Sequence, residues 1–165
     1  MMSAMTNPWR ALIKRYGGQK WFAAVFHGVS PVADRFLYRV TKGRVTVLSG
    51  TGIKTLMLTT TGRKSGEPRT VPLLYSTVDG AWIVVGSNWG QKQTPAWVLN
   101  LLAEPHATVG IHGVPTPAVA RLVEGEEREQ LWATVLTRNW PGFEDYAGRA
   151  ERHINIFALE PARKG

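Results

Sequence analysis

Hydrophobic residues recur at two different spacings along this chain, and the change between them divides it into two parts. In the first part, apolar residues stand three and four positions apart, as at Trp9, Leu12, Ile13 and Tyr16. This is the spacing of an amphipathic helix. From Lys54 onward, the apolar positions fall in short β-rich runs separated by turn residues. The pattern predicts an amphipathic helical extension over residues 1–44, followed by a mainly β domain over residues 45–165.

The predicted domain contains short strands joined by hairpins, with helices between them. The expected strands are Lys54–Thr60, Arg69–Thr77, Trp82–Ser87, His106–His112, Thr116–Val123 and Ile154–Leu159. The expected helices are residues 94–102, capped by Thr94, then Glu124–Arg138, and a further turn over Phe143–Glu151. Asp79-Gly80 predicts a tight turn, and a second turn is expected around Gly113-Val114-Pro115. The alternation indicates an α+β fold built on an antiparallel barrel.

Composition excludes several classes of protein. A hydrophobic content of 44% and a charged content of 19% are typical of a folded globular chain. The absence of cysteine excludes disulfides, thiolate metal sites and cysteine nucleophiles, and it fits a cytoplasmic location. No apolar run reaches the roughly 20 residues that span a membrane, and we expect no signal peptide.

The net charge of +8 is unevenly distributed. Residues 1–70 hold 12 Lys and Arg against 2 Asp and Glu, whereas residues 71–165 hold 8 against 10. The basic half suits a nucleic acid, an anionic membrane or an anionic cofactor. A basic amphipathic extension with Trp and Phe side chains can lie on a membrane surface. The same aromatic stripe can instead pack on the barrel or on a second subunit.

A basic loop bracketed by two glycines follows the first expected strand. It carries three cations and several hydroxyls within Thr59–Arg69. Gly62 and Gly66 permit backbone conformations that let N–H groups converge on an anion. The loop therefore predicts a phosphate or carboxylate site, with a solvated basic hairpin as the alternative.

A second segment, Gly86–Trp97, leaves a strand and enters the N-terminus of a helix. Backbone N–H groups at such an end suit a phosphate, although an ordinary connecting loop has the same pattern. The chain has no nucleophile-elbow, zinc-protease or Walker motif. If the protein is an enzyme, we expect a cofactor to carry the chemistry.

Three blocks of sequence, in order, resemble the deazaflavin-dependent nitroreductase family. The first block is Leu58–Gly66 with Pro68-Arg69 and Pro72-Leu73, the second is Gly86–Gly90 with Thr94–Trp97 and Asn100-Leu101, and the third is Trp140–Tyr146 with Ile154–Pro161. The resemblance covers about residues 40–161 and no metal site is expected from it. It implies a split β-barrel of the FMN-binding type with peripheral helices, and coenzyme F420 as the cofactor.

The resemblance also implies the cofactor-binding residues. They are Thr59, Arg63, Lys64, Ser65, Gly66, Arg69, Ser87, Asn88, Trp97 and Asn100. The basic loop would hold the anionic tail, Ser87 and Asn88 would lie beside the deazaflavin and its phosphate arm, and the helix would complete the pocket. The family often has lysine where this chain has Asn88, so Lys92 is an alternative source of that phosphate contact.

On the substrate side, the resemblance implies a pocket formed by Trp140, Phe143 and Tyr146. Nitroimidazole-activating members carry several tyrosines in this segment, of which only Tyr146 keeps a hydroxyl here. Tyr146 and Ser87 are the candidate catalytic residues, because an O–H group can donate a proton as hydride arrives at the acceptor. The alternative for Tyr146 is packing at the barrel rim.

The interpretation that combines these features is an F420H2-dependent oxidoreductase. We expect it to transfer hydride to a planar, electron-poor acceptor such as a quinone, and to reduce nitro compounds weakly. The alternatives are a non-catalytic F420 carrier and an FMN-using reductase of the same fold. A nucleic-acid partner is not expected, because the cations concentrate in one tight loop and one helix. The expected state is a monomer or homodimer in the cytoplasm, with peripheral contact at the inner face of the membrane as a further expectation.

Overall fold

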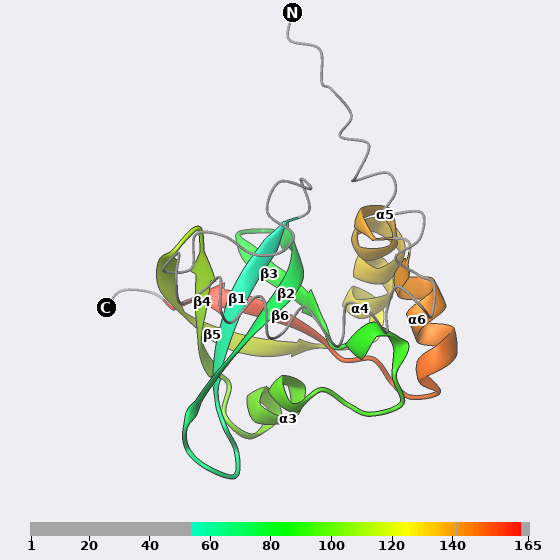
Figure 1. Ribbon diagram of the computed structural model, residues 1–165. Coiled ribbons are helices and arrows are strands. Elements are labelled where there is room, and N and C mark those ends of the chain that lie inside the picture. The colour runs from blue at the N-terminus through cyan, green and yellow to red at the C-terminus, as the bar shows by residue number, and fades with distance from the viewer. Residues whose placement is uncertain (1–53, 141, 163–165) are drawn as a thin grey trace, which may run out of the picture.

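Six antiparallel strands form a closed barrel in the computed structural model, which describes residues 54–140 and 142–162 (Figure 1). They are β1 (Thr55–Thr61), β2 (Pro68–Val78), β3 (Ala81–Val85), β4 (His106–Ile111), β5 (Val114–Val123) and β6 (Ile156–Pro161). Their order around the barrel is β1-β2-β3-β6-β5-β4. Pairing of β1 with β4 closes the barrel, for example at Thr59 and Thr108. The predicted α+β antiparallel barrel is confirmed.

Helical segments fill the connections. They are η1 (Asn88–Gly90), α3 (Ala96–Ala103), α4 (Gly125–Leu131), η2 (Trp132–Leu136), α5 (Thr137–Asn139) and α6 (Gly142–Ala150). The predicted cap Thr94 is wrong: the N-cap of α3 is Pro95, and no side chain caps it. The segments α4, η2 and α5 follow one another without a break and occupy the predicted Glu124–Arg138 helix. The part η2 is a π-helical turn, and the hydroxyl of Thr137, the residue after it, donates to the carbonyl of Trp132 at 3.1 Å.

Two tight turns fix the register of the hairpins. Asp79 and Gly80 join β2 to β3 with φ angles of 49° and 81°, as predicted. The second predicted turn is displaced: His112 and Gly113, with φ angles of 51° and 81°, join β4 to β5, and Val114 already belongs to β5. A two-residue turn with left-handed conformations matches the twist of the flanking strands. The chain therefore turns at His112-Gly113 and not over the three residues Gly113-Val114-Pro115.

Strands β3 and β6 are buried on both faces and so separate two hydrophobic cores. Val84 and Phe157 point into the barrel, where they pack with residues of β1, β4 and α3. Ile83 and Ile156 point outward against helices α4 to α6. Because side chains alternate across a strand, each of these strands contributes to both cores. Figure 1 shows α4, α5 and α6 together beside the barrel and α3 near the loop between β1 and β2.

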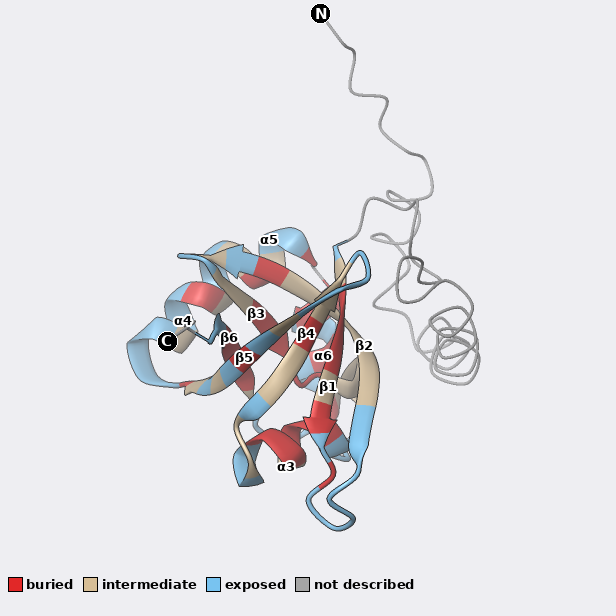
Figure 2. Ribbon diagram, turned by 90° about the vertical axis from the view of Figure 1, so that its left-hand side faces the viewer, coloured by how far each residue is buried: buried red, intermediate tan, exposed pale blue. Residues whose placement is uncertain are grey.

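Burial differs along β1 and β2 (Figure 2). The strand part of β1 is largely buried, while the loop that follows it and the start of β2 are exposed. The exposed part is the basic loop, which therefore projects from the body of the barrel. The predicted extension 1–44, its boundary at residue 45 and its aromatic stripe lie outside the described residues. Within residues 54–140 and 142–162, no helix is long and apolar enough to cross a membrane.

Candidate active site

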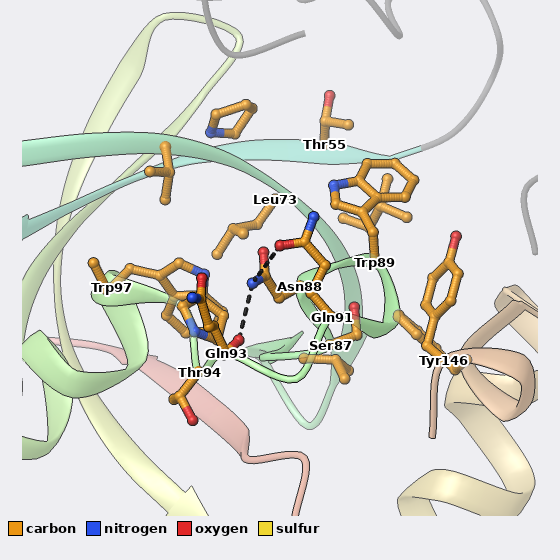
Figure 3. Close-up of a pocket in the computed structure, with 17 residues that line it drawn as sticks. Thr55, Leu73, Ser87, Asn88, Trp89, Gln91, Gln93, Thr94, Trp97 and Tyr146 are labelled. Atoms are coloured by element: carbon orange, nitrogen blue, oxygen red, sulfur yellow. Dashed lines mark hydrogen bonds between the residues drawn. The ribbon is translucent and has the colours of Figure 1, made fainter. Parts of the chain in front are cut away.

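A cavity of about 500 Å³ opens between β2, the segment joining β3 to α3, and helix α6. Its walls are mostly apolar and include Val71, Leu73, Trp89, Trp97 and Phe143. Its polar lining comes mainly from the segment after β3, with Ser87, Asn88, Gln91, Gln93 and Thr94. Figure 3 shows Trp97 at one end and Trp89 and Tyr146 at the other, with Asn88 and Gln91 between them.

The two residues predicted beside the deazaflavin both line this cavity. Ser87 is 8% exposed and lies two residues after the end of β3. The side-chain amide of Asn88 donates to the carbonyl of Gln93 at 2.9 Å and to the side chain of Gln91 at 3.4 Å. Asn88 therefore braces the segment from within. Lys92, the alternative source of a phosphate contact, instead pairs with Glu151 at 2.7 Å on the exposed surface.

Arg152 was not identified from the sequence, yet it binds this same segment. Its guanidinium donates to the carbonyls of Gly86 at 2.9 Å, Ser87 at 3.2 Å and Gln91 at 3.2 Å. Hydrogen bonds from a charged donor are stronger than those between neutral groups. No local pattern links Arg152 to residues more than 60 positions earlier, so only the fold reveals the contact.

Tyr146 lies at the α6 end of the cavity. It is 1% exposed, and burial raises its pKa to about 12, against smaller lowering effects from Trp140 and Arg149. The guanidinium of Arg149 lies 5.2 Å from the centre of the Tyr146 ring, a cation–π distance. At ordinary pH, Tyr146 is therefore a neutral phenol that can donate a proton.

The other two predicted pocket residues differ in position. Phe143 lines the cavity and meets the Tyr146 ring edge to face, with 6.2 Å between centroids. Trp140 is 4% exposed and belongs to the core between the barrel and helices α4 to α6. It is not among the residues that line the cavity. Its position is that of a packing residue behind the pocket wall.

The basic loop between β1 and β2 presents its cations to solvent. Arg63, Lys64 and Arg69 are exposed, and none of them pairs with a carboxylate within the described part of the chain. The hydroxyl of Ser65 accepts a hydrogen bond from the guanidinium of Arg69 at 3.3 Å. Gly66 has a φ of +70°, as its place in the tight loop requires. The loop is a preformed cationic projection.

Asn100 joins this loop to helix α3 and does not line the cavity. It is 3% exposed; its side-chain oxygen accepts from the backbone N–H of Arg63 at 3.2 Å, and its amide donates to Thr60 at 3.1 Å. Thr59 on β1 is hydrogen-bonded to Thr70 on the neighbouring strand β2, with 2.8 Å between the two hydroxyl oxygens. Both residues support the shape of the loop and its base.

Strand β2 connects the loop to the cavity. Arg69, Val71 and Leu73 share one face of β2, because alternate residues of a strand point the same way. Two residues of a strand span about 7 Å, so the Cα atom of Arg69 lies about 7 Å along β2 from that of Val71 in the cavity wall. The helix α3 also begins at the cavity, with Ala96 and Trp97 in its lining. The first N–H groups of a helix point out of its N-terminus, and such an end favours a phosphate. An apolar slot with a cationic exit fits coenzyme F420, which combines a planar ring, a phosphate and an anionic tail.

Comparison with known proteins identifies relatives across most of the chain. Residues 33–161 match the family model described as F420H2-dependent quinone reductase. An F420H2-dependent quinone reductase of Mycobacterium tuberculosis is 30% identical over 125 residues, which cover 74% of this chain and 84% of that protein.

Two solved structures resemble the barrel. One, described as an F420-H2 dependent reductase, has a TM-score of 0.58 and 34% identity, with 64% of this chain and 93% of that chain covered. Another, described as a domain-swapped dimer, has a TM-score of 0.61 and 30% identity, covering 76% of this chain and 95% of that chain. The family-model match over residues 33–161 includes all six strands and every residue that lines the cavity.

Proposed function

The chain belongs to the F420H2-dependent quinone reductase family, and we propose that its cavity is the site where reduced coenzyme F420 meets a quinone. The protein is an F420H2-dependent oxidoreductase with coenzyme F420 as its cofactor. The quinone, the residues that hold each partner and their roles are the proposal. The observation that supports it best is the continuity of an apolar cavity with an unpaired cationic loop along β2.

The tail of the cofactor would bind at the loop. Arg63, Lys64 and Arg69 would neutralise its carboxylates, with Ser65 and the backbone around Gly66 as hydrogen-bonding partners. Such exposed pairs contribute about 0.2–1 kcal/mol each and weaken in salt, so several cations are needed to hold a flexible tail.

The ring would occupy the cavity between α3 and the segment after β3. Trp97, which packs on Phe157 with 5.9 Å between ring centroids, gives the slot a rigid apolar wall. Ser87 and Asn88 would lie along the opposite edge. Asn100 and Thr59 would act indirectly, by fixing the loop that carries the cations.

The reduced deazaflavin supplies a hydride, and the protein's own residues orient the acceptor and deliver a proton. Tyr146 is the proposed proton donor: its pKa of about 12 keeps the phenol protonated across the working pH range. Ser87 offers a second hydroxyl at the cavity. Phe143 and Trp89 would exclude water from the end of the cavity where Tyr146 lies, because both line it with apolar rings.

A planar quinone matches this apolar end of the cavity better than a polar or charged substrate does. The relatives named as quinone reductases support the same acceptor class. Nitro compounds are a weaker class for this chain, because Tyr146 is the only phenol in the segment 140–146.

Titration of the purified protein with F420, FMN and NADPH in parallel tests the cofactor assignment. We expect F420 to bind most tightly, and to bind more tightly as its glutamate tail lengthens. Equal or tighter binding of FMN would contradict the proposal. Tight F420 binding without oxidation of F420H2 by any quinone would favour the carrier function instead.

Two proposals about partners extend beyond the site. Because one similar structure is described as a domain-swapped dimer, we include a homodimer among the expected states, to be measured by sedimentation. Membrane contact by residues 1–30 is proposed from the sequence alone. It predicts that the full chain sediments with anionic vesicles and that a chain starting near Pro31 does not.

A further inference from the structure

Three consecutive residues of η1 have left-handed backbone conformations. The φ angles of Asn88, Trp89 and Gly90 are 47°, 56° and 78°. Glycine adopts this conformation at no steric cost and asparagine tolerates it, but a bulky residue such as tryptophan rarely does. A conformation of this kind persists only where the surroundings enforce it. Contacts around the turn must therefore hold Trp89 in place.

Arg152 supplies those contacts on both sides of the turn. Its Nη2 atom donates to the carbonyls of Gly86 and Ser87, which precede the turn, at 2.9 and 3.2 Å. Its Nε atom donates to the carbonyl of Gln91, which follows the turn, at 3.2 Å. The guanidinium is a rigid planar fork, so it fixes the separation between entry and exit of the turn.

Helix α6 confines the turn from another side. A Cβ atom on Gly90 would lie 3.1 Å from Nε of Arg149 and 3.1 Å from Cα of Tyr146. Helix α6 therefore packs closely against Gly90, and the indole of the preceding residue, Trp89, lines the cavity. There it meets the Tyr146 ring edge to face, with 6.0 Å between centroids and an interplanar angle of 67° (Figure 3).

We propose that Arg152 is a positioning residue that holds Trp89 in its left-handed conformation, and that Trp89 determines which acceptors the cavity admits. The inference rests on the proposed function, because it takes the end of the cavity beside Trp89 and Tyr146 as the acceptor side. With its indole fixed there, Trp89 restricts a two-ring naphthoquinone more than a one-ring benzoquinone.

Thermal unfolding of Trp89→Gly and Trp89→Ala tests the first half without any cofactor. Both variants delete the indole, but only glycine relieves a left-handed conformation. We expect the glycine variant to have a folding equilibrium constant about five-fold larger than the alanine variant. In an Arg152→Gln background the turn can relax, so this difference should fall below about two-fold. Arg152→Lys, which keeps the charge but loses the fork, replaces the glutamine variant if that one fails to fold.

Acceptor selectivity tests the second half. The ratio of kcat/KM for a naphthoquinone to that for a benzoquinone should rise about ten-fold in Trp89→Gly. Arg152→Gln should shift the ratio in the same direction, and the double variant should shift it no further than Trp89→Gly alone. Arg121→Gln, which removes a guanidinium paired with Glu127 and Glu160 away from the turn, should leave the ratio unchanged.

The two readouts separate the failures. The role of Arg152 is overturned if Trp89→Gly is no more stable than Trp89→Ala when Arg152 is present. It is also overturned if that stability difference remains in the Arg152→Gln background. Both results hold whether or not the protein reduces quinones. An unchanged selectivity ratio in Trp89→Gly overturns the role of Trp89. If none of the quinones tested accepts hydride from F420H2 bound to the wild-type protein, the proposed function is wrong, and so is the acceptor role of Trp89. The stability comparison still decides the role of Arg152 in that case.

Discussion

The side chain of Asn100, on helix α3, accepts a hydrogen bond from the backbone N–H of Arg63, 37 positions earlier in the sequence. The same oxygen lies 3.4 Å from a guanidinium nitrogen of Arg63, and the amide group donates to the buried Thr60. One buried amide thus fixes the base of the cationic loop against the helix that begins at the cavity. The position of the loop cations depends on this contact.

Replacing Asn100 by alanine should destabilise the fold and loosen the loop together. The change removes the Asn100 side chain from the Arg63 N–H and from the Thr60 hydroxyl, and each loses that hydrogen bond. Loss of a buried hydrogen-bond partner costs about 1–3 kcal/mol in the free energy of unfolding. We expect urea unfolding to show this loss, and F420 titration to show weaker binding. If the variant keeps full dependence of affinity on tail length, Asn100 does not position the loop.

Replacing Arg63 and Lys64 together by alanine should weaken F420 binding about ten-fold at low ionic strength. Two exposed charge pairs of roughly 0.5–1 kcal/mol each account for that factor. The salt dependence of the affinity should also decrease, because fewer screened pairs remain. The control is Arg121→Ala, which removes one cation elsewhere on the surface; an effect there half as large as that of the double variant, in kcal/mol, would show that only net charge matters.

The two glycines of the loop should respond differently to alanine. At Gly62 a Cβ atom would lie 2.8 Å from Oγ of Ser65 and 3.0 Å from the carbonyl of Glu67, so the loop must move. We expect a loss of about 1–3 kcal/mol in the free energy of unfolding and weaker F420 binding. At Gly66 the space is open and only the φ of +70° is strained. The cost there should be about 1 kcal/mol, with F420 affinity nearly unchanged. Equal costs at both positions would contradict the geometry.

Tyr146→Phe should lower quinone turnover by roughly 10²-fold, the lower end of general-acid effects, because it removes one O–H and little volume. F420 affinity should barely change, since the tail sites are untouched. Steady-state kinetics with a benzoquinone provide the measurement, and Ser87→Ala is the companion variant. An unchanged rate in Tyr146→Phe with a large loss in Ser87→Ala would transfer the proton to Ser87.

Burial of Tyr146 also predicts a pH dependence of stability. The pKa is about 12 in the folded protein against about 10 for a free tyrosine, so the phenol's contribution to stability is complete below about pH 10 and is lost as the pH rises toward 12. Over that window, wild type should lose about 2–3 kcal/mol relative to Tyr146→Phe. Chemical unfolding of both proteins at a series of alkaline pH values measures the difference. A constant difference would mean that the phenol titrates normally.

Much of the fold follows from local sequence. The six strands coincide with short β-rich runs, and the Asp79-Gly80 turn has residues that favour left-handed conformations, so both leave a direct local pattern in the sequence. The Thr94 cap and the Gly113–Pro115 turn were wrong by one or two positions. A local pattern fixes which element forms, whereas tertiary packing decides its first residue.

The site is less accessible from the sequence. The cationic loop could be predicted because its charges and glycines are contiguous. The roles of Asn100 and Arg152 could not, since each acts on a segment far away in the chain and neither residue has a pattern of its own. Trp140 shows the same limit: its place in the segment suggested the pocket, but at the C-terminal end of α5 it packs in the core instead.

Single-turnover oxidation of protein-bound F420H2 by a quinone, followed anaerobically by the return of the deazaflavin absorbance, tests the central claim most directly. We predict a rate that saturates with quinone concentration, exceeds the reaction without protein, and falls in Tyr146→Phe. Replacing F420H2 by reduced FMN at the same concentration should lower the observed rate by about ten-fold or more, since FMN has no long tail for the loop cations. Oxidation no faster than the protein-free reaction, or equal rates with reduced FMN, would contradict the account.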